Sequence, residues 1–566
     1  MKYNAGLLAS IIFAVVCSIS RAAPVSSTET PVASGYYNPG TTTVTDLYVS
    51  PSGDDKHNGL TISAPMQTLR EAWARVPITL TTTGYRLNLL PGTYPCEPGP
   101  EADNCVNYFE NRHGTASHPL IMRALNGRDT VTIRGGLNIA QVDYLYLYNL
   151  NLVGGAPLPI NNSGNNLLHL ASVDHVLLHG LSVLGPDCAN DQCNNLQEVL
   201  KVNQAQYVYV EDSTIGGAWH TVVDYFSVQY GHFLNNNLHT AGQWCMYIKG
   251  GSAYLHIEGN ELHDCQLGFE SGEASNLAVM QAPWWHYEAY DIKFINNLLH
   301  DIPGVGFGAS GAYNSLFAYN TLYRVGYSND YRTYELIGII YGERGCTPTD
   351  EVPNAIDVCN DFLSRGAWGP SVITDSQQSI PNRNVYILNN LIYNPAPAQT
   401  MYQHFTVFGP IARPSDFANM PDPVRTDDAL IIRGNIIWNG PPDHPLGIEE
   451  ASQGCQSDNP TCNQSQLKAQ NAINLFEPQL IDPTHGDYRP LTGGNVISAS
   501  SMYTFFTTVT DFPAWNTFSP TVPTGTLTNT VTVDYDGAPR SEVIVPGAFG
   551  GRLTLTIHFY VPFIMR

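Results

Sequence analysis

The stretches HFLNNNLHTAG (232–242), YLHIEGNELHDC (254–265) and IKFINNLLHDI (292–302) share one pattern: alternating apolar residues, an Asn, and further apolar residues. The alternation has a period of two and is rich in Tyr, Ile, Val and Asn, which favours short strands over helices. The pattern recurs in YLYLYNLNLVGG (144–155), YVYVEDSTIGG (207–217), LFAYNTLYRVG (316–326), VYILNNLIYNP (385–395) and LIIRGNIIWNG (430–440).

The spacing of these repeats predicts a solenoid. Ser213 and Asn236 are 23 residues apart, Asn236 and Asn260 are 24 apart, and Asn297 and Asn320 are 23 apart. A period in the low twenties, built from several short strands, is typical of stacked coils. Alignment of the repeats places six asparagines at one position: Asn236, Asn260, Asn297, Asn320, Asn390 and Asn435.

This Asn column has a structural explanation. An amide side chain carries both a donor and an acceptor, so successive coils can share an internal ladder of hydrogen bonds. A second column lies three positions later, and we interpret it as a structural ring stack rather than a set of catalytic groups. The same interpretation covers the neighbouring Asp264 and Asp301. The second column is His239, His263, His300, Tyr323, Tyr393 and Trp438.

The charge balance of the chain narrows its partners. The 566 residues include 26 Lys and Arg against 49 Asp and Glu, for a formal net charge of −23. Such a deficit of cations argues against nucleic-acid binding and against a polybasic membrane surface. We therefore expect neither nucleic acid nor membrane as a partner. We also expect no organic cofactor and a monomeric protein.

The N-terminus predicts secretion. Lys2, the apolar stretch 7–16 and the small residues at 20–23 have the layout of a signal peptide over residues 1–23, too short for a membrane span. Cys17 leaves with it, and an even number of cysteines in a secreted chain suggests disulfides. The pairs are Cys96/Cys105, Cys188/Cys193, Cys245/Cys265, Cys346/Cys359 and Cys455/Cys462, the third of which would clip adjacent coils, and the sequons begin at Asn161 and Asn463.

Two insertions interrupt the period, at about 274–288 and 345–380. Long loops on a rigid solenoid are often functional. The first insertion contains Trp284, Trp285, His286 and Tyr287, which we predict as substrate-binding residues that stack on sugars. The alternative is that they cover an exposed flank of the core, and the sequence leaves both open.

The strands that precede the Asn positions carry the candidate chemistry. With Leu200, Val223, Ile248, Phe269 and Phe307 facing inward, the next residue of each strand faces outward. Outward residues of neighbouring coils lie about 4.8 Å apart, so they can touch. Simple surface ion pairs are the alternative. The outward set is Lys201, Asp224, Lys249, Glu270 and Gly308.

The two ends of the chain carry a family resemblance. LYVSPSGDDKHNGLTISAPMQTLREAWARV (47–76) resembles the start of secreted right-handed parallel β-helix proteins of the pectate-lyase-like superfamily, in which a short helix caps the open end. The stretches at 476–494, 534–540 and 547–550 are similar to their last coil. The resemblance implies an all-β, single-stranded right-handed parallel β-helix with loop insertions. We expect a signal peptide (1–23), a linker (24–44), the β-helix with its cap (45–500) and a closing segment (501–566).

A local resemblance suggests an activity. CMYIKGGS (245–252) and QLGFESGE (266–273) look like the active-site coil of the alginate lyase and chondroitinase type of polysaccharide lyase. The resemblance implies that Lys249 is the base of a β-elimination on a uronate and that calcium neutralises the uronate carboxylate. Glu270 stands where that family has an arginine. Asp224, Glu270 and Glu273 could begin a calcium site, because calcium takes several oxygen ligands.

Lyase action on an extracellular polysaccharide is thus the first expectation, with Lys249, Asp224 and Glu270 as catalytic residues and Lys201 as a secondary one. Asp224 and Glu270 lie two coils apart, about 9.6 Å between strands, which also suits the carboxylate pair of an inverting glycoside hydrolase. A third alternative is a non-catalytic solenoid that binds glycans or sits at the cell surface.

Overall fold

The computed structural model describes residues 35–96, 106–154, 166–185, 196–328, 335–349, 352–371, 377–400, 402–499, 531–540 and 545–550. The chain divides into residues 1–35 and a second unit from Tyr36 onward, which contains every element named below. The predicted signal peptide, most of the linker, Cys105, Cys188, Cys193, the Asn161 sequon and much of the closing segment lie outside the described residues. Among the residues that are described, no helix is long and apolar enough to cross a membrane.

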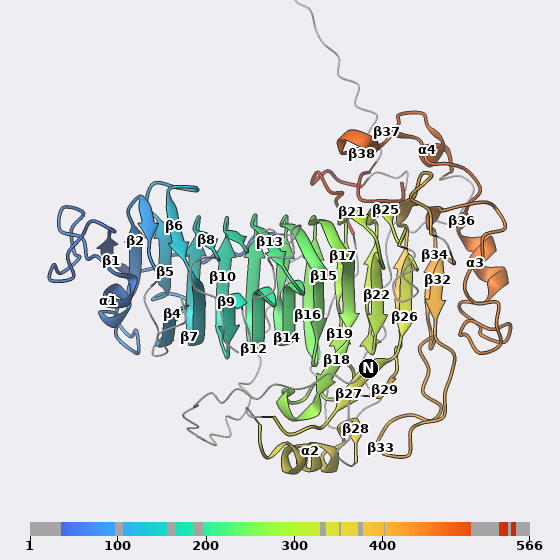
Figure 1. The fold of residues 1–566 in the computed structure, drawn as a ribbon, viewed down its shortest axis with the longest axis horizontal. Coiled ribbons are helices and arrows are strands. Elements are labelled where there is room, and N and C mark those ends of the chain that lie inside the picture. The colour runs from blue at the N-terminus through green and yellow to red at the C-terminus, as the bar shows by residue number, and fades with distance from the viewer. Residues whose placement is uncertain are drawn as a thin grey trace, which may run out of the picture. The chain divides into compact units, whose positions relative to one another are not determined.

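The strand repeats stack into one parallel sheet that winds through successive coils (Figure 1). Its first strands are β1 (Val44–Val49), β2 (Gly84–Leu89), β3 (Gly92–Tyr94), β4 (Val106–His113), β5 (Leu120–Ala124), β6 (Val131–Arg134), β7 (Gly136–Tyr148), β8 (Asn151–Val153), β9 (Asn166–Ala171), β10 (Asp174–His179) and β11 (Ser182–Leu184). The middle strands are β12 (Glu198–Glu211), β13 (Thr214–Ala218), β14 (Thr221–Leu234), β15 (Asn237–Lys249), β16 (Ser252–Glu258) and β17 (Glu261–Gly272). The later strands are β19 (Ala289–Tyr290), β20 (Lys293–Ile295), β21 (Leu298–Ile302), β22 (Phe307–Ser310), β23 (Ala312–Tyr313), β24 (Leu316–Ala318), β25 (Thr321–Val325), β26 (Ile337–Ile340), β30 (Tyr386–Leu388), β31 (Leu391–Tyr393), β32 (Phe405–Val407), β34 (Ile431–Arg433), β35 (Ile436–Trp438) and β36 (Ala472–Ile473).

The pairing confirms the predicted fold class, a single-stranded right-handed parallel β-helix with loop insertions. Each strand pairs in parallel with the equivalent strands of the coils before and after it, as β14 does with β12 and β16. The inward residues form one continuous apolar core along the coils. The N-terminal end is capped by α1 (Leu69–Ala74), which buries Leu69 and Trp73.

The Asn ladder is present as predicted. The backbone N–H of Asn236 donates to Oδ1 of Asn260 at 2.8 Å, and Nδ2 of Asn236 donates to the same oxygen at 3.0 Å and to the Val210 carbonyl at 3.0 Å. The pattern repeats from coil to coil and ends on Asn471, one coil beyond the predicted set. All six predicted side chains are buried. The ladder therefore provides partners for the buried N–H of each Asn and for a strand carbonyl of the preceding coil.

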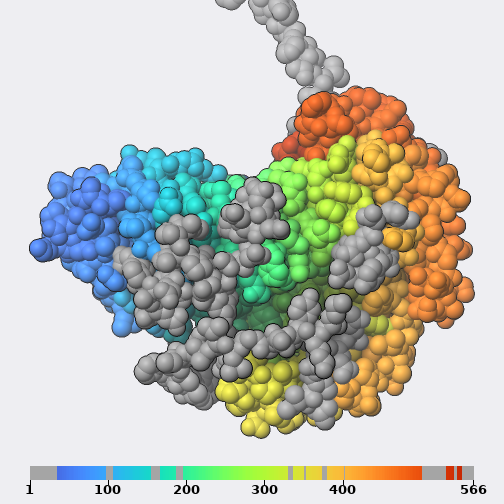
Figure 2. Space-filling model, in the orientation of Figure 1, coloured from blue at the N-terminus to red at the C-terminus, as the bar shows by residue number. Residues whose placement is uncertain are grey.

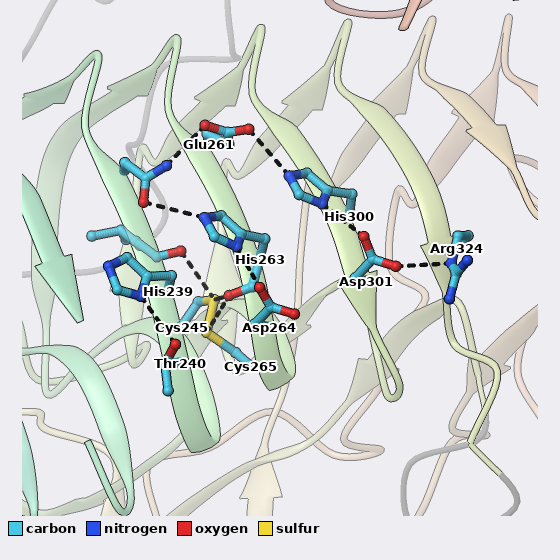
Figure 3. A network of polar contacts seen from close by, with 12 residues as sticks. His239, Thr240, Cys245, Glu261, His263, Asp264, Cys265, His300, Asp301 and Arg324 are labelled. Atoms are coloured by element: carbon cyan, nitrogen blue, oxygen red, sulfur yellow. Dashed lines mark hydrogen bonds and ion pairs between the residues drawn. A yellow bond between two sulfur atoms is a disulfide. The ribbon is translucent and has the colours of Figure 1, made fainter. Parts of the chain in front are cut away.

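The second column is also a stack (Figure 3). The ring centroids of His239 and His263 are 5.4 Å apart, and those of His263 and His300 are 4.9 Å apart. Asp264 and Asp301 each bind the imidazole of the preceding residue, at 2.7 and 3.0 Å. These contacts agree with the structural role expected for the column.

Disulfides join Cys245 to Cys265, Cys346 to Cys359 and Cys455 to Cys462, as expected, and Cys96 is also disulfide-bonded. The first of these clips β15 to β17, which are neighbouring coils.

The insertions form a lobe beside the later coils (Figure 1), and Figure 2 shows the surface of the α2 region in yellow. A small sheet pairs β18 with β27 and β27 with β29, and β28 pairs with β33. The bounds of the lobe elements are β18 (Ala274–Asn276), η2 (Leu277–Val279), β27 (Gly342–Gly345), α2 (Ala355–Ser364), β28 (Gly369–Pro370), β29 (Gln377–Ile380) and β33 (Phe417–Ala418). The remaining elements are α3 (Gln464–Gln470), β37 (Leu480–Asp482), η3 (Pro483–His485), β38 (Asp487–Pro490) and α4 (Asn495–Ala499).

The described parts of the closing segment pack on the coils. The N–H of Ala548 donates to Oγ1 of Thr321 at 2.9 Å, and the Arg540 guanidinium lies 3.8 Å from the Tyr319 ring centroid.

Candidate functional site

A column of outward side chains crosses the middle coils, as expected. Lys201 pairs with Asp224 across β12 and β14, and Glu270 pairs with Gly308 across β17 and β22. A Cβ on Gly308 would lie 2.3 Å from Oε2 of Glu270, so the glycine leaves room for that carboxyl group. We call the residues at these matched positions the central column: His169, Lys201, Asp224, Tyr247, Glu270 and Gly308.

The prediction for β15 was wrong by two residues. Tyr247, not Lys249, lies between Asp224 and Glu270, and Met246 rather than Ile248 is the matching inward residue. A shift by two positions keeps a side chain on the same face, so alternation alone cannot detect it. Lys249 therefore faces outward as predicted, but beside the column and across from Phe226.

Asp224 is the buried anion of the column, with 1% of its surface exposed. Its Oδ2 accepts hydrogen bonds from Lys201 Nζ and, at 2.9 Å, from the Tyr247 hydroxyl. Its Oδ1 has no partner among the described residues. Burial alone would raise the pKa of this carboxyl, but the ammonium groups of Lys201 and Lys249 outweigh burial and hold the pKa below its usual range. Asp224 is therefore ionised at neutral pH.

Lys249 is held as a cation. Its Nζ lies 2.7 Å from Oε2 of Glu273 and 4.3 Å from the ring centroid of Tyr247. Burial favours the neutral amine, yet the carboxylates of Asp224 and Glu273 reverse that effect and raise the pKa of Lys249. A lysine in this state does not act readily as a proton acceptor.

The pKa of Glu270 is shifted in the opposite direction from that of Asp224. It is 4% exposed, and its Oε1 accepts a hydrogen bond from Ser310 Oγ at 2.6 Å. Burial raises the pKa of Glu270 well above its ordinary value, the Ser310 bond offsets part of this, and the charges of Glu273 and Glu335 add to the rise. The surroundings of Glu270 therefore favour its protonated form, whereas those of Asp224 favour the carboxylate.

Glu198 is a further acid that the sequence analysis missed. It begins β12, three residues before Lys201, and it is buried. Burial raises the pKa of Glu198 to about 7, against the opposing charge of Lys201. Its position at the start of the strand that carries Lys201 was the feature of the sequence that could have identified it as a candidate.

The residues predicted to bind substrate in the first insertion lie in the interior. Trp284 and Tyr287 belong to one buried cluster and Trp285 to another. Trp284, Trp285, His286 and Tyr287 are each 2–6% exposed, so they offer no face on which a sugar ring could stack in this structure. The packing supports the alternative role, which is to cover the flank of the core.

The three acids named for calcium do not form a cage. Among the described residues, no three ligand atoms from Asp224, Glu270 and Glu273 lie within 4.8 Å of one another. Asp224 and Glu273 are paired with lysines instead. In the described part of the chain, the cluster that meets this distance is Asp427 with Cys455 and Cys462, which contains a disulfide and so has no thiolate for a metal. Calcium remains a prediction.

No protein-family model matches the chain, and no curated protein matches it in sequence. Among solved structures, it is similar to pectate lyase Pel9A, with 15% identity and a TM-score of 0.39 over 65% of this chain and 78% of the other. It is also similar to a rhamnogalacturonan lyase, with 12% identity and a TM-score of 0.40 over 64% and 84%. A third similarity is to an alginate lyase from Paenibacillus sp. str. FPU-7, with 14% identity and a TM-score of 0.28 over 46% and 85%. At these identities no residue role is transferred.

Proposed function

We propose that this protein is an enzyme that hydrolyses a uronate-containing polysaccharide at the central column. One observation carries the proposal: Asp224 and Glu270 share one column, and their surroundings move their pKa values in opposite directions. Two carboxyl groups whose environments separate their pKa values are the usual basis of an acid and base pair.

The spacing of the pair suits inversion. Asp224 and Glu270 are separated by Tyr247, so their strands are about 9.6 Å apart, near the roughly 6.5–9.5 Å of inverting enzymes. In that reaction Glu270 protonates the leaving oxygen as the glycosidic bond breaks. Asp224 accepts a proton from the water that attacks the opposite face of the sugar.

The lysines point to an acidic substrate. This chain has few cations, yet Lys201 and Lys249 both lie at the column, with 18% and 15% of their side chains exposed. A substrate carboxylate would compete with Asp224 for the ammonium group of Lys201. That exchange would release the carboxylate of Asp224 from Lys201, while Lys201 stays paired with the substrate. Binding of an acidic substrate would thus make Asp224 available as the base.

β-Elimination is the second candidate. It is favoured by the same ammonium groups, because elimination requires neutralisation of the uronate carboxylate. It ranks second because the raised pKa of Lys249 leaves that residue without a free electron pair for the C5 proton.

Secretion belongs to this proposal. The disulfides are of the kind that persists in oxidising compartments. N-terminal sequencing of the protein recovered from culture medium should start near residue 24, and retention of residues 1–23 would contradict it.

The activity is tested on pectate, alginate, glucuronan, glycosaminoglycans and neutral xylan, with and without chelator. New reducing ends without unsaturated-uronate absorbance indicate hydrolysis, and reducing ends with that absorbance indicate elimination. If no new reducing ends form on any of these polymers, the enzymatic proposal is wrong. Glu270→Gln should reduce turnover about 10²–10⁴-fold. Glu450→Gln, at an exposed carboxylate, is the matched control and should retain full turnover.

A further inference from the structure

Trp219 is an exposed ring at a rigid corner of the coils. It lies between β13 and β14 and is 51% exposed. Of the tryptophans in the described part of the chain, no other is exposed to this degree. An exposed indole offers a broad apolar face on which a ligand can stack.

The corner is held from both sides. The N–H of Trp219 donates to the Leu196 carbonyl of the preceding coil at 2.9 Å, and the carbonyl of His220 accepts from the N–H of Gln243 in the next coil at 2.8 Å. A Cβ on Gly242 would lie 2.0 Å from the Trp219 carbonyl oxygen, so only glycine permits this approach. Trp219 is thus presented on fixed backbone, which lowers the entropy lost when a ring stacks on it.

The corner adjoins the central column. Asp224 is five residues beyond Trp219, at most about 17 Å along an extended strand. His220, next to Trp219, is within electrostatic reach of Lys249, Asp224, Glu273 and Lys201. The backbone of Trp219 therefore lies within about 17 Å of Asp224, and its neighbour His220 is close enough to the column to be influenced by the charges there.

We propose that Trp219 is the stacking platform for a pyranose ring of the substrate, one subsite or more away from the bond cleaved at Asp224 and Glu270. This inference rests on the proposed function for its substrate class. The recognised chemistry is the apolar C–H face of a pyranose against an indole, in a chain whose uronate carboxylate is bound at Lys201 and Lys249.

The test is affinity electrophoresis of the full-length protein in gels containing pectate, alginate, glucuronan or xylan, with Glu270→Gln present throughout to prevent cleavage. Trp219→Ala should weaken retardation by roughly tenfold in apparent affinity, and Trp219→Phe should restore part of it. Tyr402→Ala removes another exposed ring, which is 42% exposed, and should bind unchanged.

Two results would overturn the platform: Trp219→Ala that binds as tightly as its parent, or a parent that no gel retards. The outcome is separable from that of the proposed function. If the wild-type protein cleaves a polymer and Trp219→Ala binds it as tightly as its parent does, only the platform is refuted. If the wild-type protein cleaves none of the polymers and Trp219→Ala loses the binding that its parent shows, the platform is supported and the enzymatic proposal is refuted.

Discussion

Arg344 and Glu288 form an ion pair in which neither side chain has any exposed surface. Nε of Arg344 lies 2.8 Å from Oε1 of Glu288, and Nη1 donates to the carbonyls of Trp285 at 2.7 Å and Trp368 at 2.9 Å. The other carboxylate oxygen of Glu288 accepts from the N–H of Gly250 at 3.1 Å. One buried pair therefore ties both insertions to the peptide that follows Lys249.

Removal of one partner should be costly. Arg344→Met leaves the carboxylate of Glu288 buried without its cation, and we expect a loss of about 3–5 kcal/mol in the free energy of unfolding. Urea denaturation followed by tryptophan fluorescence measures it, because Trp285 and Trp368 lie against the pair.

Arg365→Met in the same lobe is the matched control. Arg365 and Asp361 are 50% and 59% exposed, so this ion pair should contribute at most about 1 kcal/mol. The contact of Arg365 with the Trp285 ring, at 4.5 Å, should add about 0.5–1 kcal/mol, which still leaves the loss below that of Arg344→Met. Equal losses in the two variants would show that the buried pair has no special role in holding the lobe.

The Asn ladder gives a second stability prediction. Asn260→Ala removes both the amide that bonds Asn297 and the oxygen that accepts from Asn236, and leaves buried backbone unsatisfied. We expect a loss of about 1–3 kcal/mol, seen as a lower midpoint in thermal unfolding. Asn237→Ala, at the adjacent half-buried position, is the control and should change the midpoint much less. An unchanged midpoint for Asn260→Ala would show that the ladder does not stabilise the fold.

The ladder could be predicted from the sequence because an Asn recurs at the same position of successive repeats. Lys249 was misplaced because the alignment followed charge rather than spacing. Lys201, Asp224, Tyr247 and Glu270 are each 23 residues apart, and this constant period would have placed Tyr247 in the column. The burial of Trp285 could not be predicted, since its ring stacks on Phe362 and lies against Arg365, which are more than seventy residues away.

Acid should destabilise the protein through buried histidines. Burial lowers the pKa of His404 to about 3, and burial with a nearby cation lowers the pKa values of His169 and His286 to about 4. The unfolded chain binds these protons near pH 6.5, so stability is present above that pH and is lost as pH falls toward 4. Each such histidine contributes a slope of up to about 1.4 kcal/mol per pH unit.

Urea denaturation at several pH values between 7 and 4 measures the slope. His404→Asn should flatten it, whatever its effect at pH 7, because that side chain no longer titrates. His485→Asn, at a position whose side chain is 80% exposed, is the control and should change the slope much less. A slope that is identical in His404→Asn and in the parent would contradict the assignment.

The pH dependence of turnover separates the two candidate reactions, since they require opposite changes. Hydrolysis needs the proton on Glu270, whose pKa is raised by burial, so its rate should fall as pH rises through that pKa. Elimination needs neutral Lys249, whose pKa is raised by Asp224 and Glu273, so its rate should climb into the alkaline range.

Lys249→Arg keeps the positive charge but cannot accept a proton. Under hydrolysis this variant should keep most turnover and the alkaline decline, and under elimination it should lose about 10²–10⁴-fold. An alkaline rise that disappears in Lys249→Arg would reject Glu270 as the acid and establish Lys249 as the base.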